Sequence, residues 1–108
     1  MSLVDDPRSA PSIRWGILGP GGIARTFAEA VLGHTRSQVV AVGSRDYSRA
    51  ERFATKYGIP TTHEGYERLV ADEQVDAVYV ASPHSEHLEH ALLAIEAGKH
   101  VLVEKAFT

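Results

Sequence analysis

The sequence predicts an α/β domain in which helices cover both faces of a parallel β-sheet. Short apolar runs alternate along the chain with segments that have helical periodicity. Each pair of parallel strands needs a crossover connection, so this alternation indicates a parallel sheet. The run 39–42 is continuously apolar, as expected of a strand buried on both faces. A length of 108 residues is enough for one domain.

We expect five strands and four helices in strict alternation, closing a doubly wound sheet with strand order 3-2-1-4-5. The pattern at 48–51 (Ser-Arg-Ala-Glu) has the form of a capping box, which would open the second helix. Gly58 followed by Pro60 would end that helix. The strands are predicted at 13–18, 39–42, 61–63, 75–80 and 100–103, and the helices at 22–34, 48–57, 66–71 and 85–97.

Composition restricts the classes of function. A net charge of −3 argues against a nucleic-acid partner. No apolar run approaches the roughly 20 residues of a membrane span, so no membrane partner is expected. The chain has no cysteine, which favours the cytoplasm slightly and removes thiolate chemistry. Residues 1–12 are polar, with two prolines, and are expected to form a disordered leader before a domain at 13–108.

A glycine-rich loop follows the first predicted strand, with the form G-x-G-x-x-A over 19–24. Gly19 would permit the tight turn, and Gly21 would let the backbone approach a pyrophosphate. Ala24 would let the helix pack closely on the strand. The N–H groups of Gly22 and Ile23 would face the phosphates at the positive end of the helix. This pattern between a strand and a helix predicts a Rossmann-type site for a dinucleotide.

The residues after the second strand bear on the choice of nicotinamide cofactor. Sites for NAD usually place an acid there, on the ribose 2′-hydroxyl. This chain instead has Ser44 and Arg45, and a guanidinium matches a 2′-phosphate. We therefore favour NADP and keep NAD as the alternative. Asp46 follows too late for the usual acid and is expected to begin the next turn.

Two further motifs carry a resemblance to a known family. The first is Ser-Pro-His-Ser-Glu-His at 82–87, and the second is Ala-Gly-Lys-His-Val-Leu-Val-Glu-Lys at 97–105. From about residue 13 to 108 the chain resembles the Gfo/Idh/MocA oxidoreductases. The resemblance implies a Rossmann domain followed by a larger α/β substrate domain, which is absent from this chain. It also implies hydride transfer between NAD(P) and a hydroxyl or carbonyl of a sugar, inositol or related polyol.

The same resemblance assigns site residues. Lys105 would be the catalytic lysine near the nicotinamide, preceded by Glu104, although Ala106 replaces the family's proline. Ser82, Pro83 and His84 would form a loop that passes the cofactor, and His87 would be the histidine that begins the next helix. The family's catalytic histidine and aspartate belong to the second domain. We therefore expect the chain alone to be inactive, and the full-length protein to form a homo-oligomer.

Other readings stay open. A non-catalytic module that binds a dinucleotide or CoA for regulation or assembly would have the same fold. A metal site at His84, His87 and His90 is not expected, since the first and last lie about 120° apart around a helix. His90 and His63 are expected to be exposed.

Overall fold

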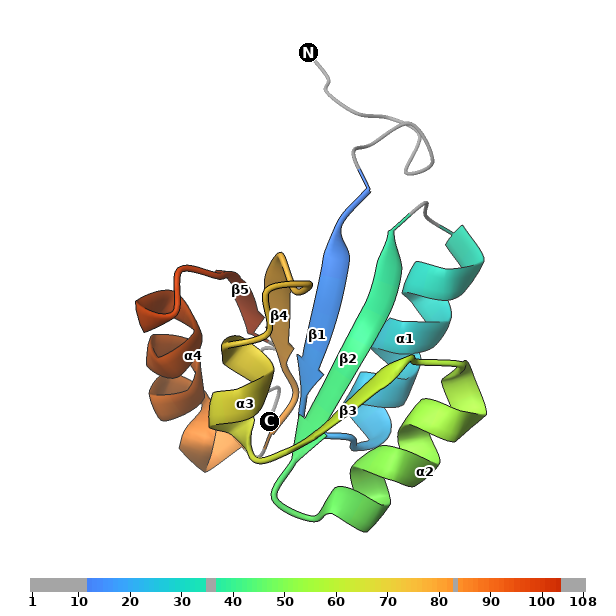
Figure 1. Cartoon of the computed structure of the whole chain (residues 1–108), viewed down its shortest axis with the longest axis horizontal. Helices are drawn as coiled ribbons and strands as arrows, with labels where there is room; N and C mark the ends of the chain where they lie inside the picture. Colours follow the sequence, from blue (N-terminus) through green and yellow to red (C-terminus); the bar gives the residue numbers. More distant parts are fainter. Residues whose placement is uncertain (1–11, 35–36, 83, 104–108) are drawn as a thin grey trace.

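The computed structural model describes residues 12–34, 37–82 and 84–103 (Figure 1). Its five strands form one parallel sheet in the predicted order β3-β2-β1-β4-β5, which confirms the doubly wound topology. Most of the predicted leader and residues 104–108 lie outside the described residues. The strands are β1 (Arg14–Leu18), β2 (Gln38–Ser44), β3 (Thr61–Glu64), β4 (Ala77–Val80) and β5 (His100–Val103).

Helices cover both faces of the sheet. Helices α1 and α2 lie to the right of the sheet in Figure 1, and α3 and α4 lie to the left. Strands are added outward from β1 in one direction to β3 and then outward in the other direction from β4 to β5, so the order of addition reverses between β1 and β4. The helices of each half cover one face. The helices are α1 (Gly22–His34), α2 (Tyr47–Tyr57), α3 (Tyr66–Val70) and α4 (His87–Glu96), with a short 3₁₀ helix η2 (His84–Glu86) before α4.

The core has two clusters, one on each face. On the α1 side, fully buried Ala24 and Ala28 pack near Ile17 of β1. The aromatic ring of Phe27 stacks on Tyr79 with centroids 3.9 Å apart and meets Trp15 edge-on at 5.0 Å. Helix α1 is thereby fixed on β1 and β4, the two strands that flank the reversal point.

On the other face, two glycines let α3 rest directly on the sheet. A Cβ on Gly16 would come within 3.1 Å of Leu69, and a Cβ on Gly43 within 3.0 Å. Leu69 is fully buried and Val70 nearly so. The helix that carries the chain across the sheet is therefore held by close packing on β1 and β2.

The capping-box prediction is wrong. Helix α2 begins at Tyr47 rather than Ser48, and its N-cap is Asp46, whose Oδ1 accepts the Arg49 N–H at 3.3 Å. The aspartate precedes the serine in the chain, and its carboxylate satisfies the first turn. Asp46 thus begins the turn, as expected. The predicted end is confirmed, since Gly58 takes the left-handed conformation with φ of 68°.

An ion pair ties β1 to β4 at the amino end of the sheet. Asp76 accepts hydrogen bonds from the Arg14 guanidinium at 2.9 and 3.1 Å and from its backbone N–H at 3.0 Å. Nearby, Lys99 Nζ donates to the carbonyls of Asp72 and Val75, both at 2.7 Å. Asp72 also lies 2.9 Å from the ring of His63, which is partly buried and not exposed as expected.

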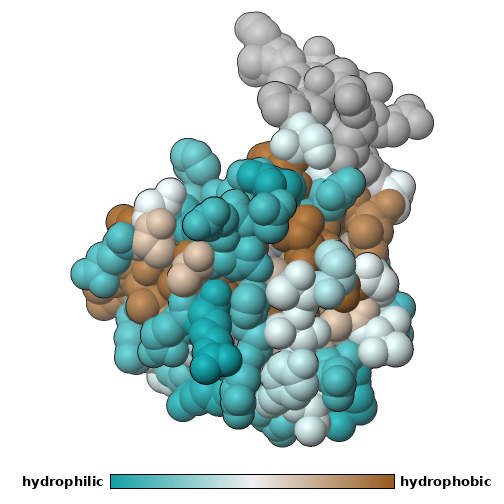
Figure 2. All heavy atoms as spheres, in the orientation of Figure 1, coloured by the Kyte–Doolittle hydropathy of each residue, from teal (hydrophilic) through white to brown (hydrophobic). Residues whose placement is uncertain are grey.

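The surface is mostly polar, with apolar side chains reaching it over α4 at the left of Figure 2. These side chains include Leu88, Leu92 and Ile95. No helix in the described ranges has the length and apolar character needed to span a membrane.

Candidate cofactor site

The loops that follow β1, β2 and β4 meet at the carboxyl edge of the sheet. The Gly19 N–H donates to the Gly43 carbonyl at 3.0 Å, and the Ala81 N–H donates to the Leu18 carbonyl at 2.9 Å. These bonds join the ends of β1, β2 and β4 at the point where the strand order reverses. Open α/β sheets bind their ligands in the crevice at this point.

The glycines of the loop are required for different structural reasons. Gly19 has a φ of 101°, and a Cβ there would stand 3.0 Å from the Ser82 nitrogen, so both conformation and space require glycine. A Cβ on Gly21 or Gly22 would meet no atom within 4 Å. The open space beside Gly21 is the room that the sequence assigns to a pyrophosphate.

Helix α1 presents its amino end to this space. Its first intrahelical hydrogen bond runs from Arg25 N–H to the Gly21 carbonyl at 3.1 Å. The N–H groups of Gly22, Ile23 and Ala24 precede that bond and can serve a ligand. The first turn of this helix holds no acidic side chain. Backbone donors, the helix dipole and the absence of a competing carboxylate together suit a phosphate.

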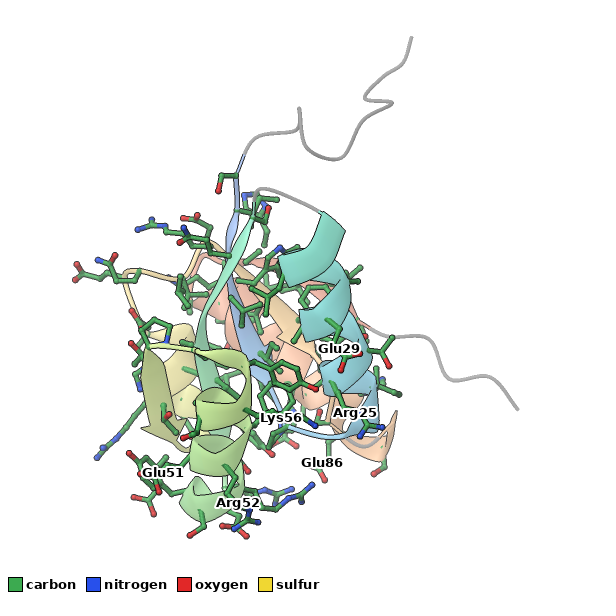
Figure 3. All side chains as sticks on the ribbon, turned by 90° about the vertical axis from the view of Figure 1, so that its right-hand side faces the viewer. Arg25, Glu29, Glu51, Arg52, Lys56 and Glu86 are labelled. Carbon is green, nitrogen blue, oxygen red and sulfur yellow. The ribbon has the colours of Figure 1, made fainter. Side chains whose placement is uncertain are left out.

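Cations gather between the glycine loop and α2. A cavity of about 280 Å³ lies there, with Arg25, Arg49 and Lys56 in its lining. Arg25 and Lys56 approach the same space from α1 and α2 (Figure 3). Arg49 Nη2 lies 3.4 Å from the Pro20 carbonyl, which sets the guanidinium beside the loop. Three positive charges next to the open glycine loop favour a polyanionic ligand.

At the end of β2, Ser44 and Arg45 differ in their surroundings. Ser44 is buried, and its Oγ accepts the Asp46 N–H at 3.1 Å. The Arg45 side chain is 68% exposed, and its Nη2 lies 2.6 Å from Oε1 of Glu86. Its guanidinium also lies 5.7 Å from the ring centroid of Tyr66. Arg45 therefore reaches across the carboxyl edge toward α4 while staying open to solvent.

Two histidines of α4 hold the loop after β4. His87 Nε2 lies 2.6 Å from the Ser82 carbonyl and so fixes the backbone of this loop. Ser82 is buried, and its Oγ lies 2.6 Å from His90 Nδ1. His90 is 5% exposed, so the expectation that it is exposed is wrong. Its position four residues before buried Ala94, on the same helix face, is the signal that could have shown this.

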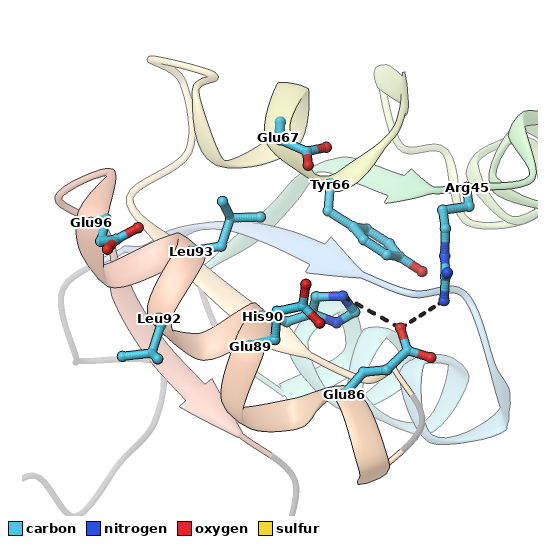
Figure 4. A pocket seen from close by; sticks show the side chains of 9 residues that line it. All are labelled: Arg45, Tyr66, Glu67, Glu86, Glu89, His90, Leu92, Leu93 and Glu96. Carbon is cyan, nitrogen blue, oxygen red and sulfur yellow. Dashed lines mark hydrogen bonds and ion pairs between the residues drawn. The ribbon is translucent and has the colours of Figure 1, made fainter.

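A second cavity of about 430 Å³ lies between α3 and α4 (Figure 4). Arg45 and Glu86 stand at one end of it, with Tyr66 and His90 beside them. The remaining lining residues are Glu67, Glu89, Leu92, Leu93 and Glu96. This cavity opens next to Arg45, on the face of the sheet opposite the glycine loop's cationic cavity.

The structure places some of the predicted site residues together, whereas others lie outside the described residues. The structure brings the glycine loop, Ser44, Arg45, Ser82 and His87 to one edge of the sheet. Pro83, Glu104 and Lys105 lie outside the described residues, and His84 is described only as the start of η2. Among the described residues, no group of three metal-ligating side chains is placed to hold a metal ion.

The fold and the site define a class. A doubly wound parallel sheet, a glycine-rich loop opening onto a helix amino end and cations around it form a dinucleotide-binding Rossmann domain. The chain belongs to the Gfo/Idh/MocA oxidoreductases: the family model described as "Oxidoreductase family, NAD-binding Rossmann fold" matches residues 13–108. The chain is thus an NAD(P)-binding Rossmann domain of this family, and the resemblance seen in the sequence is confirmed.

Named relatives are dehydrogenases. The chain is 45% identical over 109 aligned positions to D-xylose 1-dehydrogenase (NADP(+)) from Hypocrea jecorina, covering 90% of this chain and 28% of that protein. It is 44% identical over 96 positions to trans-1,2-dihydrobenzene-1,2-diol dehydrogenase from Mus musculus, covering 87% and 29%. The chain therefore spans less than a third of the length of these relatives.

The chain is also similar to solved structures of oxidoreductases that contain a nicotinamide cofactor. A 3-ketoreductase from Actinomadura kijaniata, in complex with TDP-benzene and NADP, matches with a TM-score of 0.83 and 40% identity. The match covers 91% of this chain and 31% of that one. A scyllo-inositol dehydrogenase from Lactobacillus casei, with NAD(H) and scyllo-inositol, matches with a TM-score of 0.79 and 27% identity, covering 88% and 28%.

Proposed function

We propose that this chain binds NADP(H) as the cofactor domain of a dehydrogenase that acts on a sugar, a polyol or a related diol. The observation that carries the proposal is the open space beside Gly21, which lies between the amino end of α1 and a cationic cavity. A pyrophosphate would accept hydrogen bonds from the first-turn N–H groups there. Ser82, held by His87 and His90, would form the opposite wall of the crevice.

The preference for NADP over NAD rests on charge at the end of β2. Arg45 is exposed at the position where an acid usually holds the ribose of NAD, and Arg49 lies beside the glycine loop. Guanidinium groups can bind a phosphate by two parallel hydrogen bonds, and their positive charge complements the 2′-phosphate that NAD lacks. The xylose dehydrogenase relative is described as NADP(+)-dependent, and the 3-ketoreductase structure contains NADP, which supports the same preference.

The chemistry of the parent protein follows from the cofactor and from the relatives. When bound, the nicotinamide supplies or accepts a hydride. The relatives named above act on xylose, a dihydrodiol and scyllo-inositol, so a vicinal hydroxyl compound is the expected substrate class. Lys105 would orient the reacting hydroxyl or move its proton, as the family resemblance implies. The cytoplasmic location and the homo-oligomeric state remain predictions.

Fluorescence titration of the 108-residue chain with NADPH, NADH and CoA tests the proposal. We expect NADPH to bind with a Kd on the order of 10 μM to 1 mM, since the nicotinamide end lacks part of its pocket. NADH should bind more weakly. Tighter binding of CoA than of either nucleotide would favour the alternative of a CoA-binding module, and no binding of any dinucleotide would reject the proposal.

A further inference from the structure

One carboxylate oxygen at the carboxyl edge serves two partners. Oε1 of Glu86 lies 2.6 Å from Nη2 of Arg45 and 3.5 Å from Nε2 of His90, and both contacts are drawn in Figure 4. The three side chains step inward from solvent: Arg45 is 68% exposed, Glu86 27% and His90 6%. Glu86 thus stands between an exposed cation and a buried imidazole.

Arg45 cannot keep this partner and also bind a phosphate with its full set of donors. Glu86 already accepts from one N–H of Nη2, and its negative charge offsets the positive charge that would attract a 2′-phosphate. The Glu86 carboxylate therefore acts as an internal anion that competes with the ligand. A ligand without a 2′-phosphate makes no such demand on Arg45.

His90 is placed to respond to this competition. The Glu86 carboxylate faces Nε2, so the proton of the neutral ring belongs on Nε2. Nδ1 then accepts the Ser82 hydroxyl proton across 2.6 Å. The ring of Tyr66 packs against the imidazole with centroids 4.4 Å apart. A protonated His90 would instead donate from Nδ1, and the Ser82 hydroxyl would have to turn its hydrogen away.

The charges around His90 come from three directions. Burial lowers the pKa of His90, and the positive Arg45 and the ring of His87 lower it further, against the opposing effect of Glu86 and Glu89. Removing the positive charge of Arg45, or neutralising it with a phosphate, acts in the direction that favours the imidazolium. The polar and titratable groups facing His90 are Arg45 after β2, Tyr66 of α3, Ser82 after β4, Glu86 of η2, and His87 and Glu89 of α4.

We propose that Glu86 is a specificity-determining residue that exchanges partners: it holds Arg45 in the free protein and passes to His90 when a 2′-phosphate takes Arg45. His90 then takes up a proton from solvent, and its hydrogen bond with Ser82 reverses direction. Solvent supplies this proton, which forms the Nδ1–H bond of the imidazolium, and no other covalent bond forms or breaks in this step. The inference rests on the proposed NADP site, and it adds that binding of a 2′-phosphate is linked to a protonation at the loop after β4.

Glu86→Gln tests the competition. The amide keeps the shape of the side chain but no longer holds Arg45 by charge, so NADPH should bind about two- to fivefold more tightly, the usual worth of an exposed pair. NADH affinity should be unchanged. Glu89→Gln is the matched control, because it removes an equal charge from α4 without touching Arg45, and it should leave the NADPH-to-NADH ratio near that of the wild type. Weaker NADPH binding by Glu86→Gln would overturn the proposal, since Glu86 would then be positioning Arg45 for the ligand.

The imidazole of His90 can be followed directly by NMR in the wild-type chain. Adenosine 2′,5′-bisphosphate should raise the pKa of His90, while adenosine 5′-monophosphate should leave it unchanged, because the two probes differ by the phosphate that meets Arg45. In Glu86→Gln the shift caused by the bisphosphate should be smaller. A bisphosphate that binds without moving the His90 titration would reject the exchange but not the cofactor site. Failure of NADPH and of both probes to bind would reject the proposed function itself.

Discussion

Gly19 packs against the backbone of Ser82 so closely that a Cβ on Gly19 would stand 3.0 Å from the Ser82 nitrogen and 3.1 Å from its Cα. Gly21, two residues further on, faces open space. The glycine loop thus contains one glycine needed by the fold and another that leaves room for a ligand.

Valine substitutions should separate these two roles. Gly21→Val should abolish NADPH binding, because its side chain would fill the space for the pyrophosphate, and should leave thermal unfolding unchanged. Gly19→Val should destabilise the fold by at least about 1–3 kcal/mol, the strain of a side chain in a left-handed conformation, with the backbone overlap in addition. Thermal denaturation and fluorescence titration of both variants check this. If Gly21→Val bound NADPH normally, the phosphate-loop assignment would be wrong.

Removal of the Arg45 guanidinium should affect one cofactor. Arg45→Ala should weaken NADPH binding by roughly 1.5–3 kcal/mol, the worth of a charge-assisted hydrogen bond, and leave NADH binding nearly unchanged. Arg52→Ala removes the same charge from an exposed position on α2 and serves as the control. Titration with both nucleotides measures the effect. Equal losses for NADPH and NADH would contradict a 2′-phosphate site at Arg45.

Acid should weaken the ion pair between Arg14 and Asp76, which ties β1 to β4. Hydrogen bonds from the Arg14 side chain and backbone lower the pKa of Asp76 from 3.8 to about 2. A lowered pKa in the folded state means that the stabilisation is complete above the unfolded-state value and is lost as the pH falls through about 2. Asp76→Asn should therefore be less stable than the wild type at pH 7, with the difference shrinking between pH 4 and 2. Urea unfolding at several pH values measures this difference, and a constant difference would assign the effect to something other than the charge.

Lys105 can be tested in a longer parent chain that carries the rest of the enzyme. Lys105→Met should reduce turnover by about 10²–10⁴-fold, the usual range for a positioned proton-transfer group, with little change in cofactor Kd. Lys105→Arg distinguishes the two roles, because arginine keeps the charge but does not release its proton. Recovery of turnover in Lys105→Arg would indicate a charged donor, whereas continued loss would indicate proton transfer. Near-normal turnover in Lys105→Met would remove the residue from the reaction.

The fold could be predicted because the sequence patterns that determine each helix and strand lie within that element or next to it. Apolar runs, helical spacing and turn residues such as Gly58 each act on their neighbours, and the alternation then determines the topology. The sequence encodes the helix boundaries less clearly, because competition between neighbouring N-cap residues decides them. Asp46 and Ser48 are both good N-cap residues, and the structure uses the one whose carboxylate reaches Arg49 N–H.

The site could be predicted only where one chain segment forms it. The glycine loop is such a segment, and its position between a strand and a helix is sufficient to predict a dinucleotide-binding site. The contact between Arg45 and Glu86 joins residues 41 positions apart, and no periodicity encodes it. His90 was missed for a different reason. Its burial follows from the helix face that it shares with Ala94, and the spacing among the histidines carries no information about that face.

The ion pair of Arg14 with Asp76 and the contacts of Lys99 lie at the end of the sheet opposite the glycine loop. These polar contacts, which hold the strands together, therefore lie far from the proposed cofactor site. Substitutions at the carboxyl edge can change what is bound while the far edge continues to hold the strands in register. Such a division would allow one scaffold to diversify in ligand preference during evolution. If the proposed cofactor site holds, Ser44, Arg45 and Arg49 are the positions at which to redesign cofactor choice in the laboratory.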